Sequence, residues 1–234
     1  MTTTTHPSDA AVRPATAAAP DPARRRAALV AGGGLLAMAA VAVPANAVLQ
    51  PLTDAGAPAE VAARLADGEA PAHLAVLGFL AVVVLDIVVA WGLAGFLRRD
   101  TPSLATLAGW LRVGYAGMLG AAVIRLGEGL RAEDPTLAFA GVRGFDEGWR
   151  LALLVFGVHL AVVGIALLRT TGVPRWLAVG VVLAGLAYVV DTVVRTMLAD
   201  PSSAGMALTV VVAVLATLGE LGLAVWLLVR GRRS

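Results

Sequence analysis

Four ionisable side chains stand inside long apolar stretches of this chain: Asp86, Arg112, His159 and Glu220. A charge at the centre of a bilayer costs at least about 2.5–3.5 kcal/mol, so such side chains should face one another or water. With His159 neutral, the two carboxylates and one arginine sum to −1. Because an unpaired buried charge tends to be neutralised, His159 or a carboxyl should take up a proton. The set therefore has the composition of a proton-coupled site.

A purely structural interpretation of the same residues stays open. In it, Arg112 and Glu220 form an ion pair that clamps two helices together, and His159 donates to a backbone carbonyl. The functional interpretation predicts instead a cavity that reaches the four side chains.

A second polar pair lies in the stretch LAYVVDTVVRTML, where Asp191 and Arg195 are four residues apart. This spacing places both side chains on one helix face, where they can form an ion pair, and the arginine can extend to the membrane surface. The alternative is that Asp191 lines the outer mouth of a cavity.

Several chemistries have no support in the sequence. The chain has no cysteine, and it lacks the H-E-x-x-H, G-x-S-x-G and P-loop patterns of metalloproteases, hydrolases and nucleotide-binding proteins. A bis-histidine haem would need His73 and His159, which the predicted helices place at different depths. We expect no metal site and no cofactor.

The elements that hold these residues are predicted to be membrane-spanning helices. Of the 234 residues, 59% are hydrophobic and only 15% are charged, against about a quarter charged in soluble domains. Six apolar blocks have roughly the 20 residues that a helix needs to cross a bilayer. They are Ala27–Leu49, His73–Leu97, Leu104–Arg125, Trp149–Leu168, Trp176–Leu198 and Met206–Val229. The fold class is all-α, a polytopic transmembrane bundle of six helices over residues 24–234, behind a disordered tail of residues 1–23 rich in Thr, Ala and Pro.

The helix rise gives each polar residue a depth. At 1.5 Å per residue from the nearest flanking arginine or helix start, Asp86, Arg112, His159 and Glu220 lie roughly 15–18 Å into the membrane. They form a mid-membrane polar cluster, because the hydrocarbon core is about 30 Å thick. Asp191 lies roughly 24 Å from the same side, so Asp191 and Arg195 form an outer-leaflet pair.

Arginine placement predicts the orientation. The arginines gather beside alternate block ends, at Arg24, Arg25, Arg26, Arg98, Arg99, Arg169, Arg175, Arg230, Arg232 and Arg233. The loop of residues 50–72 has one arginine against four acids. The positive-inside rule then places both termini in the cytoplasm. The dispersed arginines form no nucleic-acid-binding stripe, so the lipid bilayer is the expected partner and nucleic acid is not.

The first block and two of the connections need separate expectations. Three arginines, an apolar stretch and Ala45-Asn46-Ala47 could form a cleavable signal peptide, but the apolar stretch is long for one, so we expect a retained helix. Residues 57–68 should form a short amphipathic helix on the outer surface. Residues 126–148 should be an outside loop with a short interfacial helix.

The second half resembles a known family. The stretches LRVGYAGML, LLVFGVHLAVVG, TGVPRWLAVGVVLAGLAYVVD and GELGLAVWLLVRG are similar to the bacterial domain-of-unknown-function 4386 family. The resemblance runs from about residue 26 to the C-terminus. It implies a multi-span inner-membrane protein with a retained first helix, and it implies no catalytic residues.

Three classes of function are compatible with this sequence. A small permease or proton-coupled carrier should have a water-accessible cavity that reaches the polar cluster. A sensing or accessory membrane protein should have a sealed, fully paired cluster and an exposed small-residue helix face for a partner. A membrane enzyme would need a nucleophile or a metal beside the cluster, and the sequence offers neither. A small-molecule or ion ligand is compatible with the sequence, which does not identify it.

Overall fold

The computed structural model describes residues 21–197 and 203–230, and this part of the chain is helical throughout apart from its connections. The helices are α1 (Pro22–Thr53), α2 (Pro58–Ala66), α3 (Ala70–Leu97), α4 (Pro102–Leu130), α5 (Pro135–Leu168), α6 (Arg175–Met197) and α7 (Ser203–Val229). The predicted all-α fold is confirmed.

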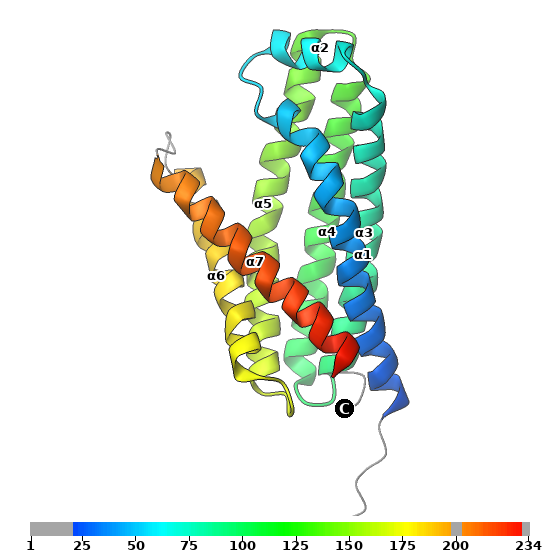
Figure 1. Cartoon of the computed structure of the whole chain (residues 1–234), viewed down its shortest axis with the longest axis vertical. Coiled ribbons are helices and arrows are strands. Elements are labelled where there is room, and N and C mark those ends of the chain that lie inside the picture. The colour runs from blue at the N-terminus through cyan, green and yellow to red at the C-terminus, as the bar shows by residue number, and fades with distance from the viewer. Residues whose placement is uncertain (1–20, 198–202, 231–234) are drawn as a thin grey trace, which may run out of the picture.

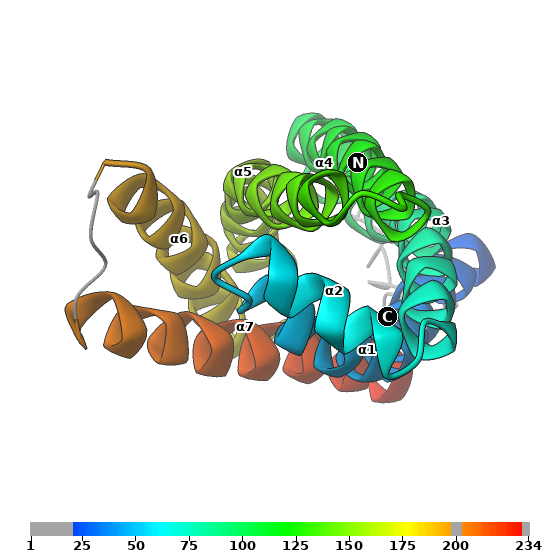
Figure 2. The same ribbon diagram turned by 90° about the horizontal axis from the view of Figure 1, so that it is seen from above.

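The six long helices pack in a ring, each against the next, in the order α1, α3, α4, α5, α6, α7 and back to α1. Figure 1 shows α3, α4 and α5 running nearly parallel to the long axis, whereas α7 crosses the bundle obliquely. Figure 2 shows the short helix α2 lying across one end of the bundle, over α1 and beside α5. We call this end the α2 end, and the opposite end, where α1 begins and α7 finishes, the arginine end.

The outer face of the ring is apolar. Large side chains such as Trp91, Trp110, Leu74 and Ile124 are at least 60% exposed. In water such a surface would be unstable, but in hydrocarbon it is solvated by lipid. Five helices, α1 and α3–α6, are long and apolar enough to cross a membrane. The chain is therefore a polytopic helical membrane protein.

The sixth predicted span corresponds to α7. The helix itself runs from Ser203 to Val229, and the apolar part within the described residues is the shorter segment Val214–Val229. The predicted count of six spanning helices is thus approximately right.

The predicted N-terminal tail, residues 1–23, overlaps the first residues of α1. Residues 1–20 lie outside the described residues, but α1 already begins at Pro22. Its first turn is capped by Asp21, whose carboxylate accepts a hydrogen bond from the backbone N–H of Ala23 at 2.9 Å. Proline at the first helical position and an acidic cap are a common helix start.

The prediction that residues 126–148 form a loop was wrong. α4 continues to Leu130 and α5 starts at Pro135, so most of these residues are helical. The polar side chains of these residues suit a helix that projects beyond the hydrocarbon, because acidic and basic residues form ion pairs along the helix. Arg125 contacts Glu128 and Arg150 contacts Asp146, at 2.8 and 2.7 Å. The expected short helix after residue 57 is present as α2, which buries Val61 and Leu65.

Two glycines hold the projecting parts of α4 and α5 together. A Cβ on Gly141 would lie 2.7 Å from the backbone nitrogen of Gly129 and 2.8 Å from the carbonyl oxygen of Arg125. Both neighbours are backbone atoms, which cannot move aside. The two helices can cross this closely only because neither residue has a side chain.

We predict that Gly141→Ala lowers the thermal unfolding temperature in detergent, with a loss of roughly 1–3 kcal/mol from overpacking. The matched control is Gly117→Ala, because a Cβ on Gly117 meets no atom within 4 Å. That control should be neutral or stabilising, since alanine favours helix over glycine by about 1 kcal/mol. Equal behaviour of the two variants would show that the close crossing is not a stability determinant.

Candidate functional site

Arg112 on α4 is the centre of a buried polar cluster in the interior of the ring. Its side chain is fully buried, and its Nη2 atom lies 2.8 Å from Oδ1 of Asp86 on α3, which is also fully buried. The same Nη2 lies 3.7 Å from the sulfur of Met38 on α1. The arginine thus connects α3 and α4 by charge and contacts α1 through a polarisable sulfur atom.

His159 on α5 completes the cluster, and its two ring nitrogens have different partners. Nδ1 lies 2.9 Å from the carbonyl oxygen of Ala108, and Nε2 lies 3.2 Å from Nη1 of Arg112. A carbonyl can only accept, so Nδ1 carries the proton, and the arginine can only donate, so Nε2 accepts. This assignment describes a neutral imidazole, which leaves Arg112 and Asp86 as one positive and one negative charge.

The ion pair is held by proximity more than by aligned hydrogen bonds. Within the described residues, neither carboxylate oxygen of Asp86 accepts a well-directed hydrogen bond, and Nε of Arg112 has no acceptor. The 2.8 Å contact is short enough for a strong Coulomb attraction in this dry interior. Removing one member would therefore strand a charge that nothing nearby can solvate.

An aromatic side chain separates this cluster from the space beside it. The guanidinium carbon of Arg112 lies 5.3 Å from the ring centre of Phe156, and that ring stacks on His159 at 5.8 Å. On its other sides Phe156 contacts Tyr115 at 4.7 Å and Tyr188 at 5.5 Å. Asp86, Arg112 and His159 are all fully buried, so within the described residues none of them is exposed to the lateral space.

Glu220 on α7 does not join the ion pair. Arg112 pairs with Asp86, so the alternative that paired it with Glu220 was wrong about the partner. Glu220 is half-buried, and among the described residues it makes neither a salt bridge nor a hydrogen bond. Of the four residues predicted to meet, the structure brings three into contact and places the fourth at a cavity.

The cavity lies beside the buried cluster and has a volume of about 370 Å³. We call it the lateral cavity. All six long helices contribute to its lining, which is mostly apolar. The residues that line it are Leu35, Met38, Ala39, Ala42, Val43, Asn46, Phe79, Val82, Tyr115, Leu119, Trp149, Leu153, Phe156, Tyr188, Ala216, Thr217, Glu220 and Leu221.

The lateral cavity opens between α1 and α7. These helices touch near the arginine end, where a Cβ on Gly32 would lie 2.8 Å from the carbonyl oxygen of Ala224. From there they diverge toward the α2 end (Figure 1). Asn46 on α1 and Thr217 on α7 both line the cavity and are both exposed. The opening therefore faces sideways, toward the surroundings of the bundle.

Several polar groups lie on the cavity wall. Nε1 of Trp149 is buried and makes no well-aligned hydrogen bond among the described residues, although the Tyr115 side chain lies close to it. The Glu220 carboxyl has no partner among the described residues, and a buried polar group without a partner is a ready contact for a bound molecule. Asn46 and Thr217 add further polar atoms to a lining that is mostly apolar.

The comparisons with known proteins place the chain in a family. The sequence profile of "Domain of unknown function (DUF4386)" matches residues 30–231. The chain belongs to the DUF4386 family. A relative from Archaeoglobus fulgidus, described as an uncharacterized protein, is 26% identical over 163 residues, which cover 70% of this chain and 87% of the relative. No solved structure matches the chain significantly.

The predicted resemblance to DUF4386 is confirmed by this match, which includes all four residues of the expected cluster.

The second polar pair of this DUF4386 chain is formed along α6. Nε of Arg195 donates to both carboxylate oxygens of Asp191, at 3.0 and 3.1 Å. Both side chains are about one-fifth exposed or less. The pair lies near the C-terminal end of α6, and Asp191 is not among the residues that line the lateral cavity.

The aromatic and sulfur-containing side chains around Arg112 were not predicted from the sequence. Tyr115 is three residues after Arg112, and Phe156 is three residues before His159, so both share a helix face with a predicted residue. That spacing could have predicted that both aromatic side chains lie near the cluster. Met38 and Asn46 carried no such signal, because their relation to the site depends on how α1 packs.

Among the residues that the structure describes, no group of three or more His, Asp or Glu side chains could hold a metal ion. The arrangement is suited to binding and to charge recognition.

Proposed function

We propose that this protein binds a small amphipathic molecule that is dissolved in the membrane, with Glu220 recognising a cationic or proton-donating head group. The observation that carries the proposal is an ionisable carboxyl group with no partner among the described residues, on the wall of a 370 Å³ cavity. Binding sites for small molecules commonly measure about 300–1,000 Å³ and are apolar with a few polar groups.

The charge balance supports a cationic head group. Asp86 and Arg112 neutralise each other, and His159 is in a neutral tautomer. Of the four residues predicted to meet, Glu220 is then the one without a counter-ion among the described residues, and an ionised carboxylate without a counter-ion is costly in the membrane interior. A ligand amine that forms a charge-assisted hydrogen bond to Glu220 would supply the missing positive charge.

The position of the opening supports a ligand that arrives from the bilayer. Val43 on α1 is 69% exposed, and Thr217 on α7 is also exposed, so the mouth lies between two surface positions of apolar helices. A molecule with a hydrocarbon tail could enter sideways without crossing water.

Two side chains connect the lateral cavity to the buried cluster. Met38 and Phe156 line the cavity, and both contact Arg112. A ligand that displaces either of them would alter the surroundings of the Asp86–Arg112 pair. This coupling is what a sensing or accessory protein requires, and it favours that class. A proton-coupled carrier is the second candidate, because a cavity carboxyl can exchange a proton with its ligand.

The proposal is tested with three probes that share a tail and differ in the head: dodecylamine, dodecanol and dodecanoate. Each is added to the purified full chain in detergent, and thermal unfolding is followed, since a ligand that binds only the folded protein raises its stability. We expect the amine to bind at least about tenfold more tightly than the alcohol, as hydrogen bonds to charged groups contribute about 1.5–3 kcal/mol. Dodecanoate should stabilise least. Equal stabilisation by all three, or a preference for dodecanoate, would overturn the proposal.

We further propose that the protein lies in the bacterial inner membrane with the arginine end in the cytoplasm, because Arg98, Arg99, Arg169 and Arg175 all lie at or next to the helix ends there. A reporter fused after the C-terminus should then be cytoplasmic, whereas one inserted between α1 and α2, at residues 54–57, should be outside. Reporters that land on the same side would contradict this topology.

A further inference from the structure

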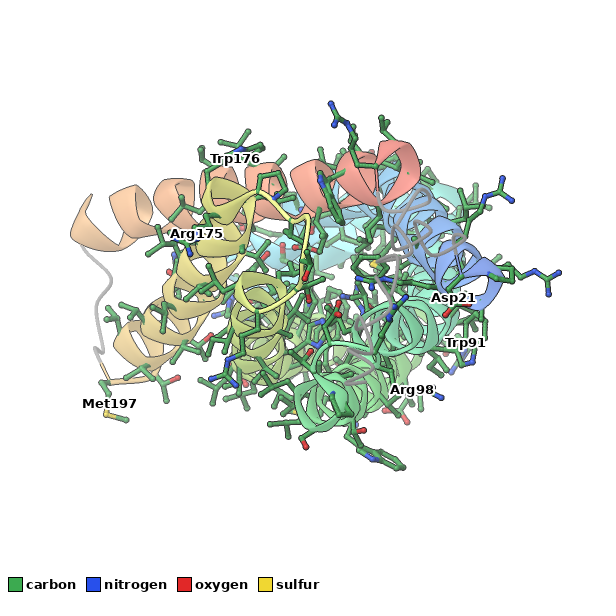
Figure 3. The ribbon with its side chains drawn as sticks, turned by 90° about the horizontal axis from the view of Figure 1, so that it is seen from below. Asp21, Trp91, Arg98, Arg175, Trp176 and Met197 are labelled. Carbon is green, nitrogen blue, oxygen red and sulfur yellow. The ribbon has the colours of Figure 1, made fainter. Side chains whose placement is uncertain are left out.

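A second concave site lies at the arginine end, between α1 and α3, with a volume of about 620 Å³. It shares no residue with the lateral cavity. We call it the arginine groove. The residues that line it are Asp21, Ala23, Arg24, Arg26, Ala27, Trp91, Gly95, Arg98 and Arg99. Figure 3, which looks at the arginine end, shows Asp21, Trp91 and Arg98 on the same side of the bundle.

The floor of the arginine groove is a buried cation. Arg24 is 6% exposed, and its Nη2 contacts Oδ2 of Asp100 at 2.8 Å. Its guanidinium carbon lies 4.6 Å from the ring centre of Phe96. Nε of Arg24 is nevertheless buried without an acceptor among the described residues. The groove therefore contains an immobilised guanidinium with one donor still to be satisfied.

The rim adds positive charge that nothing in the described chain neutralises. Arg26, Arg98 and Arg99 are exposed, and none forms a salt bridge among the described residues. The one acid that lines the groove, Asp21, already accepts a hydrogen bond as the cap of α1. Arg24 is already paired with Asp100, so the three exposed arginines outnumber the one lining aspartate and create a site for an anion. Planar guanidinium groups suit the oxygens of a phosphate.

The position of Trp91 indicates what the phosphate in the arginine groove is attached to. Its side chain is 60% exposed on the outer face of α3, and it also lines the groove. Tryptophan favours the boundary between hydrocarbon and head groups, where its ring contacts lipid. An anion that meets Trp91 and the arginines together carries its phosphate next to an apolar chain.

We infer that the arginine groove binds the phosphate of an anionic phospholipid, with Trp91 against the glycerol and upper acyl chain. The assignment goes beyond the proposed ligand of the lateral cavity and does not depend on it. Basic residues at a membrane surface each contribute about fivefold to binding of anionic lipid.

The experiment titrates dioleoyl-phosphatidylglycerol, dioleoyl-phosphatidylcholine or soluble glycerol 3-phosphate into the purified full chain in detergent, with thermal unfolding as the readout. The groove variant is Arg26→Gln/Arg98→Gln/Arg99→Gln, which keeps Arg24 and its ion pair. The matched control is Arg169→Gln/Arg175→Gln/Arg230→Gln, which removes three exposed arginines from the same end but outside the groove.

We expect the wild type and the control to bind phosphatidylglycerol at least about tenfold more tightly than phosphatidylcholine, and the groove variant to bind the two within about twofold. Trp91→Ala should weaken phosphatidylglycerol binding while leaving glycerol 3-phosphate unaffected. Equal losses in the groove variant and the control would overturn the site in favour of general surface charge. Glycerol 3-phosphate that binds as tightly as the lipid would overturn the lipid assignment and identify a soluble phosphate as the ligand.

Discussion

Replacing Arg112 with leucine is expected to lower the free energy of unfolding by about 3–5 kcal/mol, the usual effect of removing one member of a buried ion pair. The change leaves the Asp86 carboxylate fully buried without its counter-charge, and it removes the donor to Nε2 of His159. Asp86→Asn should be at least as damaging, because a stranded carboxylate can become neutral by binding a proton, whereas arginine cannot lose one.

The double variant Asp86→Asn/Arg112→Leu should recover much of the loss, because no unpaired ion remains. Unfolding of the wild type, both single variants and the double variant in detergent gives the coupling energy. The control is the same cycle at Arg125 and Glu128, which pair at 2.8 Å but are more than half exposed. Exposed pairs typically couple by about 0.2–1 kcal/mol. A coupling at Asp86–Arg112 no larger than this would contradict the account of the buried cluster.

Filling the lateral cavity should abolish ligand binding without unfolding the protein. Ala42 on α1 is half-buried and lines the cavity, so Ala42→Phe places a ring in the space that the ligand would use. We expect dodecylamine to lose at least about tenfold in apparent affinity, which corresponds to about 1.4 kcal/mol. The stability readout is again thermal unfolding in detergent.

Ala81→Phe is the matched control, because Ala81 on α3 is exposed and does not line the cavity. It should keep the affinity of the wild type for dodecylamine. If Ala42→Phe also keeps that affinity while remaining folded, the amine binds elsewhere, and the lateral cavity is not the binding site.

Much of the fold follows from the sequence because a bilayer imposes a length on apolar segments. Blocks of about 20 apolar residues predicted α1 and α3–α7, since a spanning helix satisfies all of its own backbone hydrogen bonds. The extensions of α4 and α5 were missed for the same reason. A predicted spanning helix was ended at the first charged residues, because only apolar residues were counted. A helix can nevertheless continue into water, and it does so here through residues such as Arg125, Glu128, Asp146 and Arg150.

The sequence predicted that Asp86, Arg112 and His159 lie near one another, but it did not predict which carboxylate pairs with Arg112. Helix rise places Asp86 and Glu220 in the same layer as Arg112, so depth alone cannot select between the two carboxylates. The choice depends on how each helix is rotated about its axis, which is set by contacts such as Gly92 against Ala31. The lateral cavity depends on the divergence of α1 from α7, which no local pattern in either helix encodes (Figure 1).

The most direct test of the central claim is the preference for amine over alcohol in Glu220→Gln. Glutamine keeps the shape of the side chain and removes its charge. In the wild type we expect dodecylamine to bind at least about tenfold more tightly than dodecanol. In Glu220→Gln we expect dodecylamine to lose this advantage, while dodecanol binding stays unchanged. Glu147→Gln, which removes an exposed carboxyl outside the cavity, should keep the full preference. A Glu220→Gln protein that still prefers the amine by the wild-type ratio would contradict the assignment of Glu220 as the group that recognises the ligand.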